Sequence, residues 1–79
     1  MADIISPLPG VFYTSPGPDK PPFVTVGDSI DAGQAVGLVE VMKQFTEIRS
    51  EVSGTVKSVE VENGATVNPG TVLVVVDEG

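Results

Sequence analysis

The course of this chain is decided by the stretch Val36-Gly37-Leu38-Val39-Glu40-Val41-Met42-Lys43-Gln44-Phe45-Thr46-Glu47-Ile48. No Gly, Pro, Asn or Asp interrupts the sequence between Leu38 and Ser53. A single strand of that length would extend roughly 50 Å, at about 3.3 Å per residue. A folded chain of this size has a radius of gyration of only about 12 Å. The run must therefore coil into a helix or turn back on itself as a hairpin.

The local pattern of this run leaves both alternatives open. Its apolar residues recur at spacings of three and four, as on one face of a helix; they are Leu38, Val41, Met42, Phe45, Ile48 and Val52. Branched side chains, which favour strands, stand among them, and no N-cap residue precedes Leu38. The choice depends on the rest of the sequence.

An internal repeat decides between the two. The aligned pairs are Gly27 with Gly64, Ile30 with Val67 and Val36–Val39 with Leu73–Val76 at an offset of 37 residues, and Ser6–Phe12 with Ser50–Val56 at an offset of 44. The offsets differ by seven residues, which lie in a proline-rich loop of the first half. Such a repeat indicates two similar β units packed about an approximate two-fold axis, because neither unit could bury its apolar face alone.

The repeat favours a hairpin for the central run. The strand before Lys43 aligns with the end of Thr71–Val76, a valine-rich run that we expect to be a strand buried on both faces. We therefore predict a hairpin with Met42-Lys43 at its tip. Phe45 and Ile48 follow the tip, and we expect both to fill the core, with packing beneath an arm attached at the tip as the alternative for Phe45.

Shorter segments complete an all-β chain. The expected strands are Ile4-Ile5, Val11–Tyr13, Phe23–Val26 and Val52–Glu62, the last with a bulge between Val56 and Val59. Asn63-Gly64 is the strongest hairpin-turn dipeptide in the chain. Residues 15–22 include four prolines and should form a stiff loop that projects from the body. The aligned Gly10 and Gly54 should serve tight backbone geometry.

Composition excludes several classes of function. The 79 residues suffice for one domain, 1–79, with a small core. Cys and His are absent, which excludes disulfides, thiol nucleophiles, imidazole bases and the usual zinc ligands. The net charge of −7 and the scattered basic residues argue against a nucleic acid partner. Without a membrane-spanning apolar run or a signal peptide, we expect a cytoplasmic protein with no membrane association.

Carboxylate pairs are the remaining candidates for catalysis. Glu60 and Glu62 alternate on one expected strand, and Asp28 and Asp31 lie in a turn-like segment. A solvated acidic surface explains both pairs more simply than acid–base chemistry does. The sequence therefore gives no support to an enzyme.

The residues at the expected tip are unusual for a tight turn. Such turns ordinarily use Asn-Gly or Asp-Gly, whose backbones accept a positive φ, whereas this one would use Met42-Lys43. An exposed ammonium is protonated and therefore a poor nucleophile, but another enzyme could recognise and acylate it. Acylation would create a flexible tether that holds a cofactor at high effective concentration. The alternative is that Lys43 is simply a solvent-facing turn residue.

The tip and its flanks resemble a known family. Glu40-Val41-Met42-Lys43 is similar to the Glu-Ala-Met-Lys-Met motif of the biotinyl/lipoyl attachment domain family, in the form found in biotin carboxyl carrier domains. Three further segments, Ser6–Tyr13, Phe23–Asp28 and Ser53–Val56, are similar to the carrier subunit of bacterial acetyl-CoA carboxylase. The likeness covers essentially the whole chain.

The resemblance implies a fold and a function. The fold would be a flattened barrel-sandwich hybrid of two β units related by a pseudo-two-fold axis, with residues 15–22 as a protruding thumb able to touch a biotin ring. The alternative for this thumb is a surface loop without function. Lys43 would carry biotin, attached by a biotin protein ligase that recognises Met42 and Glu40, although Glu40 fits a solvated strand residue equally well.

The carrier would have no activity of its own. Its biotin would act as a swinging arm that accepts a carboxyl group at a biotin carboxylase and gives it up at a carboxyltransferase. The complex would be acetyl-CoA carboxylase-like and serve fatty acid biosynthesis. The chain begins almost at its first expected strand, which fits either a separate small subunit or an excised domain.

Two departures from the motif keep alternatives open. Val41 replaces the usual alanine, and Gln44 replaces the usual second methionine. Lipoyl domains place an acidic or polar residue before the lysine and usually alanine after it, so Met42 favours biotin whereas Gln44 weakens the match. A lipoyl carrier and an unmodified interaction or scaffold module are the alternative functions.

Overall fold

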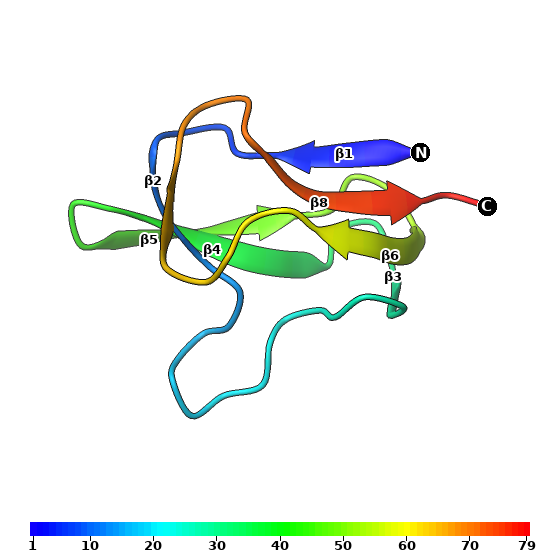
Figure 1. Cartoon of the computed structure of the whole chain (residues 1–79), viewed down its shortest axis with the longest axis horizontal. Helices are drawn as coiled ribbons and strands as arrows, with labels where there is room; N and C mark the ends of the chain where they lie inside the picture. Colours follow the sequence, from blue (N-terminus) through cyan, green and yellow to red (C-terminus); the bar gives the residue numbers. More distant parts are fainter.

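Two four-stranded antiparallel sheets make up the fold in the computed structural model, which describes residues 1–79 (Figure 1). The strands are β1 (Ala2–Ile5), β2 (Gly10–Tyr13), β3 (Ser29–Ile30), β4 (Ala35–Val41), β5 (Gln44–Arg49), β6 (Gly54–Val59), β7 (Ala65–Val67) and β8 (Val72–Asp77). One sheet has the strand order β1-β8-β6-β3 and the other β5-β4-β2-β7. The chain is all-β, as predicted, and the central run is the β4–β5 hairpin and not a helix.

The internal repeat relates the two sheets strand for strand. An offset of 44 residues brings β1 and β2 onto β5 and β6, and an offset of 37 brings β3 and β4 onto β7 and β8. The strand order of the first sheet then becomes that of the second. Each sheet takes strands from both halves of the sequence, so the two halves are interlocked about the predicted pseudo-two-fold axis.

Two buried serines mark where the halves interlock. Gly70 N donates a 2.9 Å hydrogen bond to Ser6 O, and at the aligned positions Gly33 N donates a 2.7 Å bond to Ser50 O. Each serine hydroxyl also donates to the carbonyl oxygen two residues further on, at 2.6 and 2.5 Å. These bonds satisfy the backbone carbonyl and the hydroxyl of two residues that are almost fully excluded from solvent.

Twelve buried apolar side chains fill the space between the sheets. They are Ile4, Phe12, Val24, Ile30, Val36, Val39, Ile48, Val56, Val67, Leu73, Val74 and Val76. The two aligned glycines lie where strands approach closely, because a Cβ on Gly10 or Gly54 would overlap the carbonyl oxygen of Glu40 or Asp77, respectively. The prediction of tight backbone geometry at these glycines is confirmed.

The segment Phe23–Val26 is not a strand, and the prediction was wrong. Asp28 Oδ2 accepts a 2.9 Å hydrogen bond from Thr25 N, and Asp28 N donates a 3.0 Å bond to Thr25 O. A local turn therefore uses the backbone groups of Thr25 that pairing with another strand would need.

Two further predictions concern the second half. Asn63-Gly64 forms a turn, but this turn joins β6 to β7, which lie in different sheets, and so it does not close a hairpin. The predicted bulge between Val56 and Val59 is present, as a register shift between Val56 and Ser58 in the pairing of β6 with β8.

The molecule is flattened, with principal extents of 37 × 28 × 19 Å. Figure 1 shows the β4–β5 turn at one end of the long axis and both chain termini at the other. The connection between β2 and β3, which contains the thumb, projects from the body below the sheets in this view. The fold contains no helix of the length and apolar character that a membrane crossing requires.

Candidate functional site

The tip of the β4–β5 hairpin is a two-residue turn. Val41 pairs with Gln44, which leaves Met42 and Lys43 as the turn residues, with φ angles of 50° and 68°. Positive φ at both central residues is the pattern of the turn that matches the twist of a two-stranded hairpin. The predicted tip is thus confirmed, and its two residues are the only non-glycine residues in the chain with positive φ.

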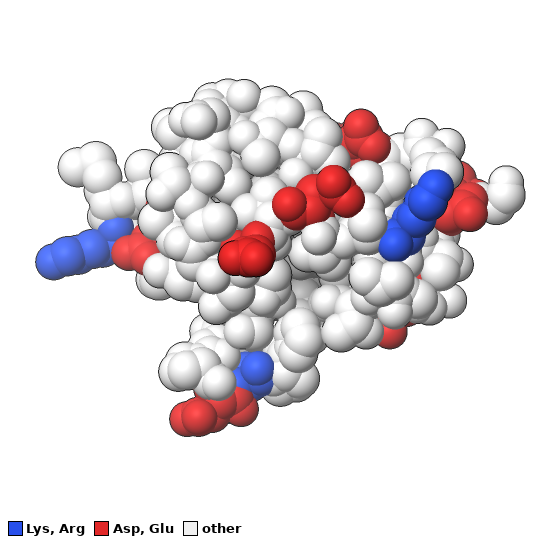
Figure 2. Space-filling model, viewed as in Figure 1, with Lys and Arg blue, Asp and Glu red and all other residues white.

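Lys43 and Met42 both extend from this tip into solvent. Met42 is 90% exposed, and Lys43 makes no ion pair, since the one ion pair of the chain joins Arg49 to Glu47. Figure 2 shows a basic side chain that projects past the end of the molecule at the β4–β5 turn, whereas acidic side chains are spread over the visible face. The Lys43 amine is therefore accessible to an external enzyme.

The hairpin register determines which side chains accompany the tip. Glu40 pairs with Phe45, and Leu38 pairs with Tyr13 on the neighbouring strand β2. Because residues two apart in a strand share a face, all four side chains lie on the outer face of this sheet. Phe45 is 60% exposed, so its expected place in the core is wrong, whereas Ile48 is buried as predicted.

Tyr13 contacts both Glu40 and Phe45 on this outer face. Its hydroxyl donates a 3.0 Å hydrogen bond to Glu40 Oε1, and its ring lies 6.3 Å from the ring of Phe45, centroid to centroid. The hydrogen bond to the Glu40 carboxylate, with smaller effects of desolvation and of the carboxylate charge, raises the pKa of Tyr13 above its ordinary value. Glu40 is thus half-buried and bound to a neighbour, and not simply a solvated strand residue.

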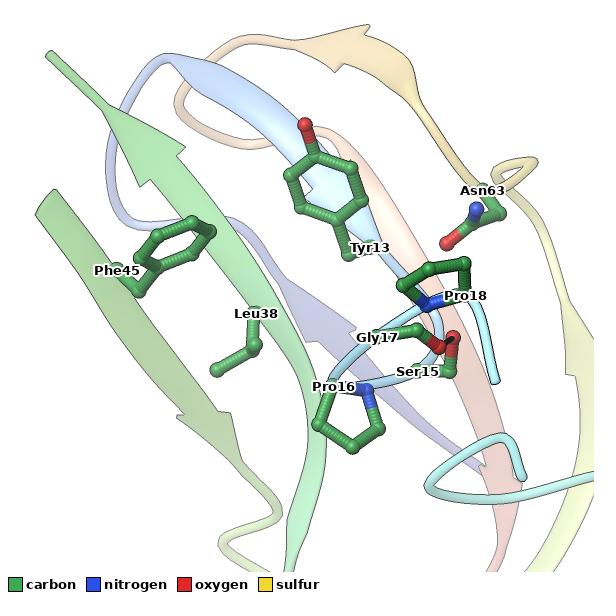
Figure 3. A pocket seen from close by; sticks show the side chains of 8 residues that line it. All are labelled: Tyr13, Ser15, Pro16, Gly17, Pro18, Leu38, Phe45 and Asn63. Carbon is green, nitrogen blue, oxygen red and sulfur yellow. Dashed lines mark hydrogen bonds between the residues drawn. The ribbon is translucent and has the colours of Figure 1, made fainter. Parts of the chain in front are cut away.

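A groove of about 290 Å³ lies between this outer face and the thumb (Figure 3). We call it the thumb groove; its lining residues are Tyr13, Ser15, Pro16, Gly17, Pro18, Leu38, Phe45 and Asn63. Two aromatic rings, a leucine and two prolines make its walls mainly apolar, and Ser15 and Asn63 contribute polar groups. Such a groove suits a small ligand with an apolar body and a few polar atoms.

The tip lysine and the thumb were predictable from the sequence, but the groove between them was not. Tyr13, Leu38 and Asn63 were not singled out as site residues. The repeat contained one sign that Asn63 has a role of its own. The aligned residue in the first half is Val26, so the asparagine is not required by the turn that both halves share. The structure brings Phe45 to the groove two residues after Lys43, on the same hairpin.

A family model described as "Biotin-requiring enzyme" matches residues 2–76. This chain belongs to that family. Among the curated relatives, biotin carboxyl carrier protein of acetyl-CoA carboxylase 2 from Arabidopsis thaliana chloroplasts is 48% identical over 71 residues, which are 90% of this chain and 28% of the relative. The corresponding protein of Nostoc is 45% identical over 64 residues, 81% of this chain and 35% of the relative.

A solved structure of a carboxylase contains a region with a similar fold. Urea carboxylase from Kluyveromyces lactis matches with a TM-score of 0.80 and 26% sequence identity, over 96% of this chain and 6% of the carboxylase. The chain spans between about a quarter and a half of the length of the curated relatives that it matches. This chain therefore corresponds to only part of each of these larger proteins.

Proposed function

We propose that this protein is a biotin carboxyl carrier domain, in which Lys43 is the residue that carries biotin. The observation that carries the proposal is the exposed, unpaired lysine in a two-residue turn at the end of the molecule. Membership of the biotin-requiring enzyme family supports it, as does the similarity to carrier proteins of acetyl-CoA carboxylase.

The residues around Lys43 fit an attached biotin. The free amine is accessible for an amide bond to the carboxyl group of biotin, and the amide, unlike the ammonium, carries no charge that must stay in water. The apolar thumb groove lies beside the same hairpin. Biotin attached here would accept a carboxyl group at a biotin carboxylase and give it up at a carboxyltransferase.

The role of the chain itself would be to hold the attachment point of biotin in place. Strands β4 and β5 pair as far as Val41 and Gln44, so the attachment point is fixed by the sheet up to the residue before the tip. Beyond this point the long side chain of Lys43 extends into solvent, and this tether would keep the attached group at high effective concentration near successive active sites. We propose that the domain catalyses no reaction itself.

The thumb groove is the proposed resting place of the biotin ring. Tyr13, Leu38 and Phe45 offer one wall, and Pro16 and Pro18 of the thumb offer the other. If residues 15–22 are replaced by a short turn, the ring of the biotinylated domain should become as mobile as a free side chain, measured by nuclear magnetic resonance. Unchanged ring mobility and unchanged carboxylation would remove the proposed role of the thumb.

Recognition by a biotin protein ligase is proposed to use Met42 and Glu40. Met42 offers an exposed apolar side chain next to the amine, and Glu40 stands on the outer face where Tyr13 fixes its carboxylate. Gln44 replaces the methionine that is usual in the family motif. We expect Gln44→Met to be modified faster than the parent by a ligase from an unrelated organism, and equal rates would contradict a role for this flank.

Intact mass of the protein from its native host, followed by peptide mapping around Lys43, tests the central proposal. We expect a biotinyl increment on Lys43 and none in Lys43→Arg. A lipoyl increment would identify a lipoyl carrier instead. An unmodified lysine in cells with an active ligase, together with retained partner binding by Lys43→Arg, would favour a scaffold module.

The proposed partners are a biotin protein ligase, a biotin carboxylase and a carboxyltransferase. The names of the relatives and of the structural neighbour, all parts of carboxylases, support the last two. We propose the cytoplasm as the compartment and fatty acid biosynthesis as the pathway. The Arabidopsis thaliana relatives are chloroplastic, so the alternative compartment is the chloroplast. Cell fractionation followed by detection with an antibody raised against this domain distinguishes the cytoplasm from the chloroplast.

A further inference from the structure

The thumb makes no hydrogen bond to the body of the molecule along its length. Within residues 15–22, Lys20 N donates to Gly17 O at 3.1 Å and Ser15 Oγ donates to the same carbonyl at 3.1 Å. The loop is closed at its root, where Phe23 N donates a 2.8 Å bond to Thr14 O. The orientation of the thumb therefore depends on what holds its two root residues. Phe23 packs against the core beside the buried Val24, which leaves Thr14 as the other root residue to be held.

Thr14 is held by a side chain from the other half of the sequence. Asn63 Oδ1 accepts a 2.8 Å hydrogen bond from Thr14 N and a 3.3 Å bond from Thr14 Oγ1, across 49 positions of the chain. Because Thr14 N is a donor only, the atom that faces it must be the amide oxygen of Asn63. Figure 3 shows Asn63 at the rim of the thumb groove, with this oxygen directed toward the thumb.

The internal repeat provides a natural control for this contact. Gly64 N donates to Phe12 O at 2.7 Å, and the aligned Gly27 N donates to Val56 O at 2.8 Å, so both halves use the same backbone turn. The residue before Gly27 is Val26, which is 65% exposed and has no polar side chain to offer. The connection that follows Val56 has no thumb. The asparagine thus stands only in the half that faces the thumb.

We propose that Asn63 is a positioning residue that clamps the root of the thumb and so sets the position of one wall of the thumb groove. The clamp rests on hydrogen bonds within the unmodified chain. Its consequence for an attached biotin rests on the function proposed above, in which that groove receives the ring. Asn63 would act on the ring through the thumb.

The clamp is tested on the unmodified full chain with three variants. Asn63→Ala removes the acceptor, Asn63→Asp keeps an oxygen at the same position, and Asn68→Ala is the matched control at an exposed asparagine whose side chain makes no hydrogen bond. Amide hydrogen exchange and backbone order parameters of residues 14–23 are measured. We expect Asn63→Ala to speed exchange at Thr14 and Phe23 about fivefold.

Thumb order and the two comparison variants decide whether Asn63 holds the thumb. In Asn63→Ala the order parameters of the thumb should fall toward about 0.6, the level of a flexible loop. Asn63→Asp should restore protection, and Asn68→Ala should behave as the parent. Unchanged exchange at Phe23 and unchanged thumb order in Asn63→Ala would overturn the clamp, even if the amide of Thr14 itself exchanged faster.

A second measurement separates the clamp from the proposed function. In the biotinylated chain, we expect Asn63→Ala to increase ring mobility, and to add nothing once residues 15–22 have been replaced by a short turn. An equal effect with and without the thumb would overturn the positioning role. A loosened thumb beside a ring whose mobility is unchanged would leave the clamp standing and contradict the groove as the resting place.

Discussion

At the scale of single residues, the tip of the β4–β5 hairpin places an exposed lysine in a backbone conformation that lowers the free energy of unfolding. Met42 and Lys43 have φ angles of 50° and 68°, a region that costs residues with a Cβ roughly 1–2 kcal/mol. Asn-Gly suits this turn, although glycine loses more entropy on folding. We predict that replacing Met42-Lys43 by Asn-Gly raises the free energy of unfolding by about 1 kcal/mol, measured by urea denaturation.

The control for this prediction keeps the strained backbone. Lys43→Arg removes the proposed attachment site but retains a side chain with the same backbone preferences, so its free energy of unfolding should stay within about 0.5 kcal/mol of the parent. Equal stability of the Asn-Gly variant and the parent would mean that the turn is not strained. Because arginine keeps both the positive charge and the strained backbone, the comparison separates the effect of the backbone from that of losing the lysine itself.

Tyr13 offers a second prediction at this scale, because it is the only tyrosine and tryptophan is absent. Its hydrogen bond to Glu40 raises its pKa in the folded state. The resulting contribution to stability is complete below about pH 10, the unfolded pKa, and is lost as the pH rises through the higher folded pKa. An absorbance titration should show the phenol titrating above pH 10 in the parent, and at lower pH in Glu40→Ala, which removes the acceptor. Equal midpoints would contradict the bond.

At the scale of strands, Phe12 of β2 and Gly37 of β4 form a complementary pair. Phe12 is fully buried, and a Cβ on Gly37 would overlap its ring. The aligned residues in the second half are Val56 and Val74, both buried. One large and one absent side chain in the first sheet therefore replace two medium side chains in the second.

This pairing predicts a strong coupling between the two positions. Gly37→Val should lower the free energy of unfolding by roughly 3 kcal/mol through overpacking. Adding Phe12→Val, which copies the valine pair of the second half, should recover part of that loss. Urea unfolding of the two single variants and the double variant forms the cycle, and additive losses would refute the coupling.

The repeat is what made the strands and the tip predictable, because two aligned segments must form the same element. The face of Phe45 was not predictable in the same way. Its side chain points outward because the turn contains two residues and pairs Phe45 with Glu40, and a turn one residue longer would change its face. The strand expected at Phe23–Val26 failed because the Asp28 side chain captures Thr25 N, a contact that propensity does not register.

The thumb groove could not be predicted from the sequence, for a different reason. It forms between a loop and a sheet face, so it depends on where the thumb points and on the distant residue Asn63 that holds the thumb root. Neither hydrophobic pattern nor turn propensity encodes such a contact. Lys43 could be singled out because its position in the chain, the hairpin tip, was itself predictable.

At the scale of the whole molecule, the pseudo-two-fold axis places the chain termini where a second hairpin tip would be. Ala2 pairs with Val76, as Thr46 pairs with Val39 next to the tip. Figure 1 shows the two ends together, at the opposite end of the long axis from the β4–β5 turn. The β4–β5 turn and the chain ends are therefore at equivalent places of the repeat, at opposite ends of the long axis.

This arrangement predicts that the chain tolerates circular permutation. Gly79 aligns with Met42 and Met1 with Phe45, so only the counterparts of Lys43 and Gln44 are missing, and two inserted residues between Gly79 and Met1 would give the new turn the length of the existing one. New ends opened between residues 18 and 19 fall in the thumb, which makes no hydrogen bond to the body.

The permuted chain tests separately the stability of the two sheets and the ability of the thumb groove to hold the attached ring. Its free energy of unfolding should lie within about 1 kcal/mol of the parent, because the cut removes no strand pairing. A ligase should modify Lys43 as before, since the hairpin is intact, whereas the attached ring should be more mobile because the cut thumb no longer forms a continuous wall. Urea unfolding, intact mass and ring relaxation measure the three effects. A large loss of stability would mean that a continuous thumb is part of the fold, and a well-ordered ring would mean that the sheet face alone holds it.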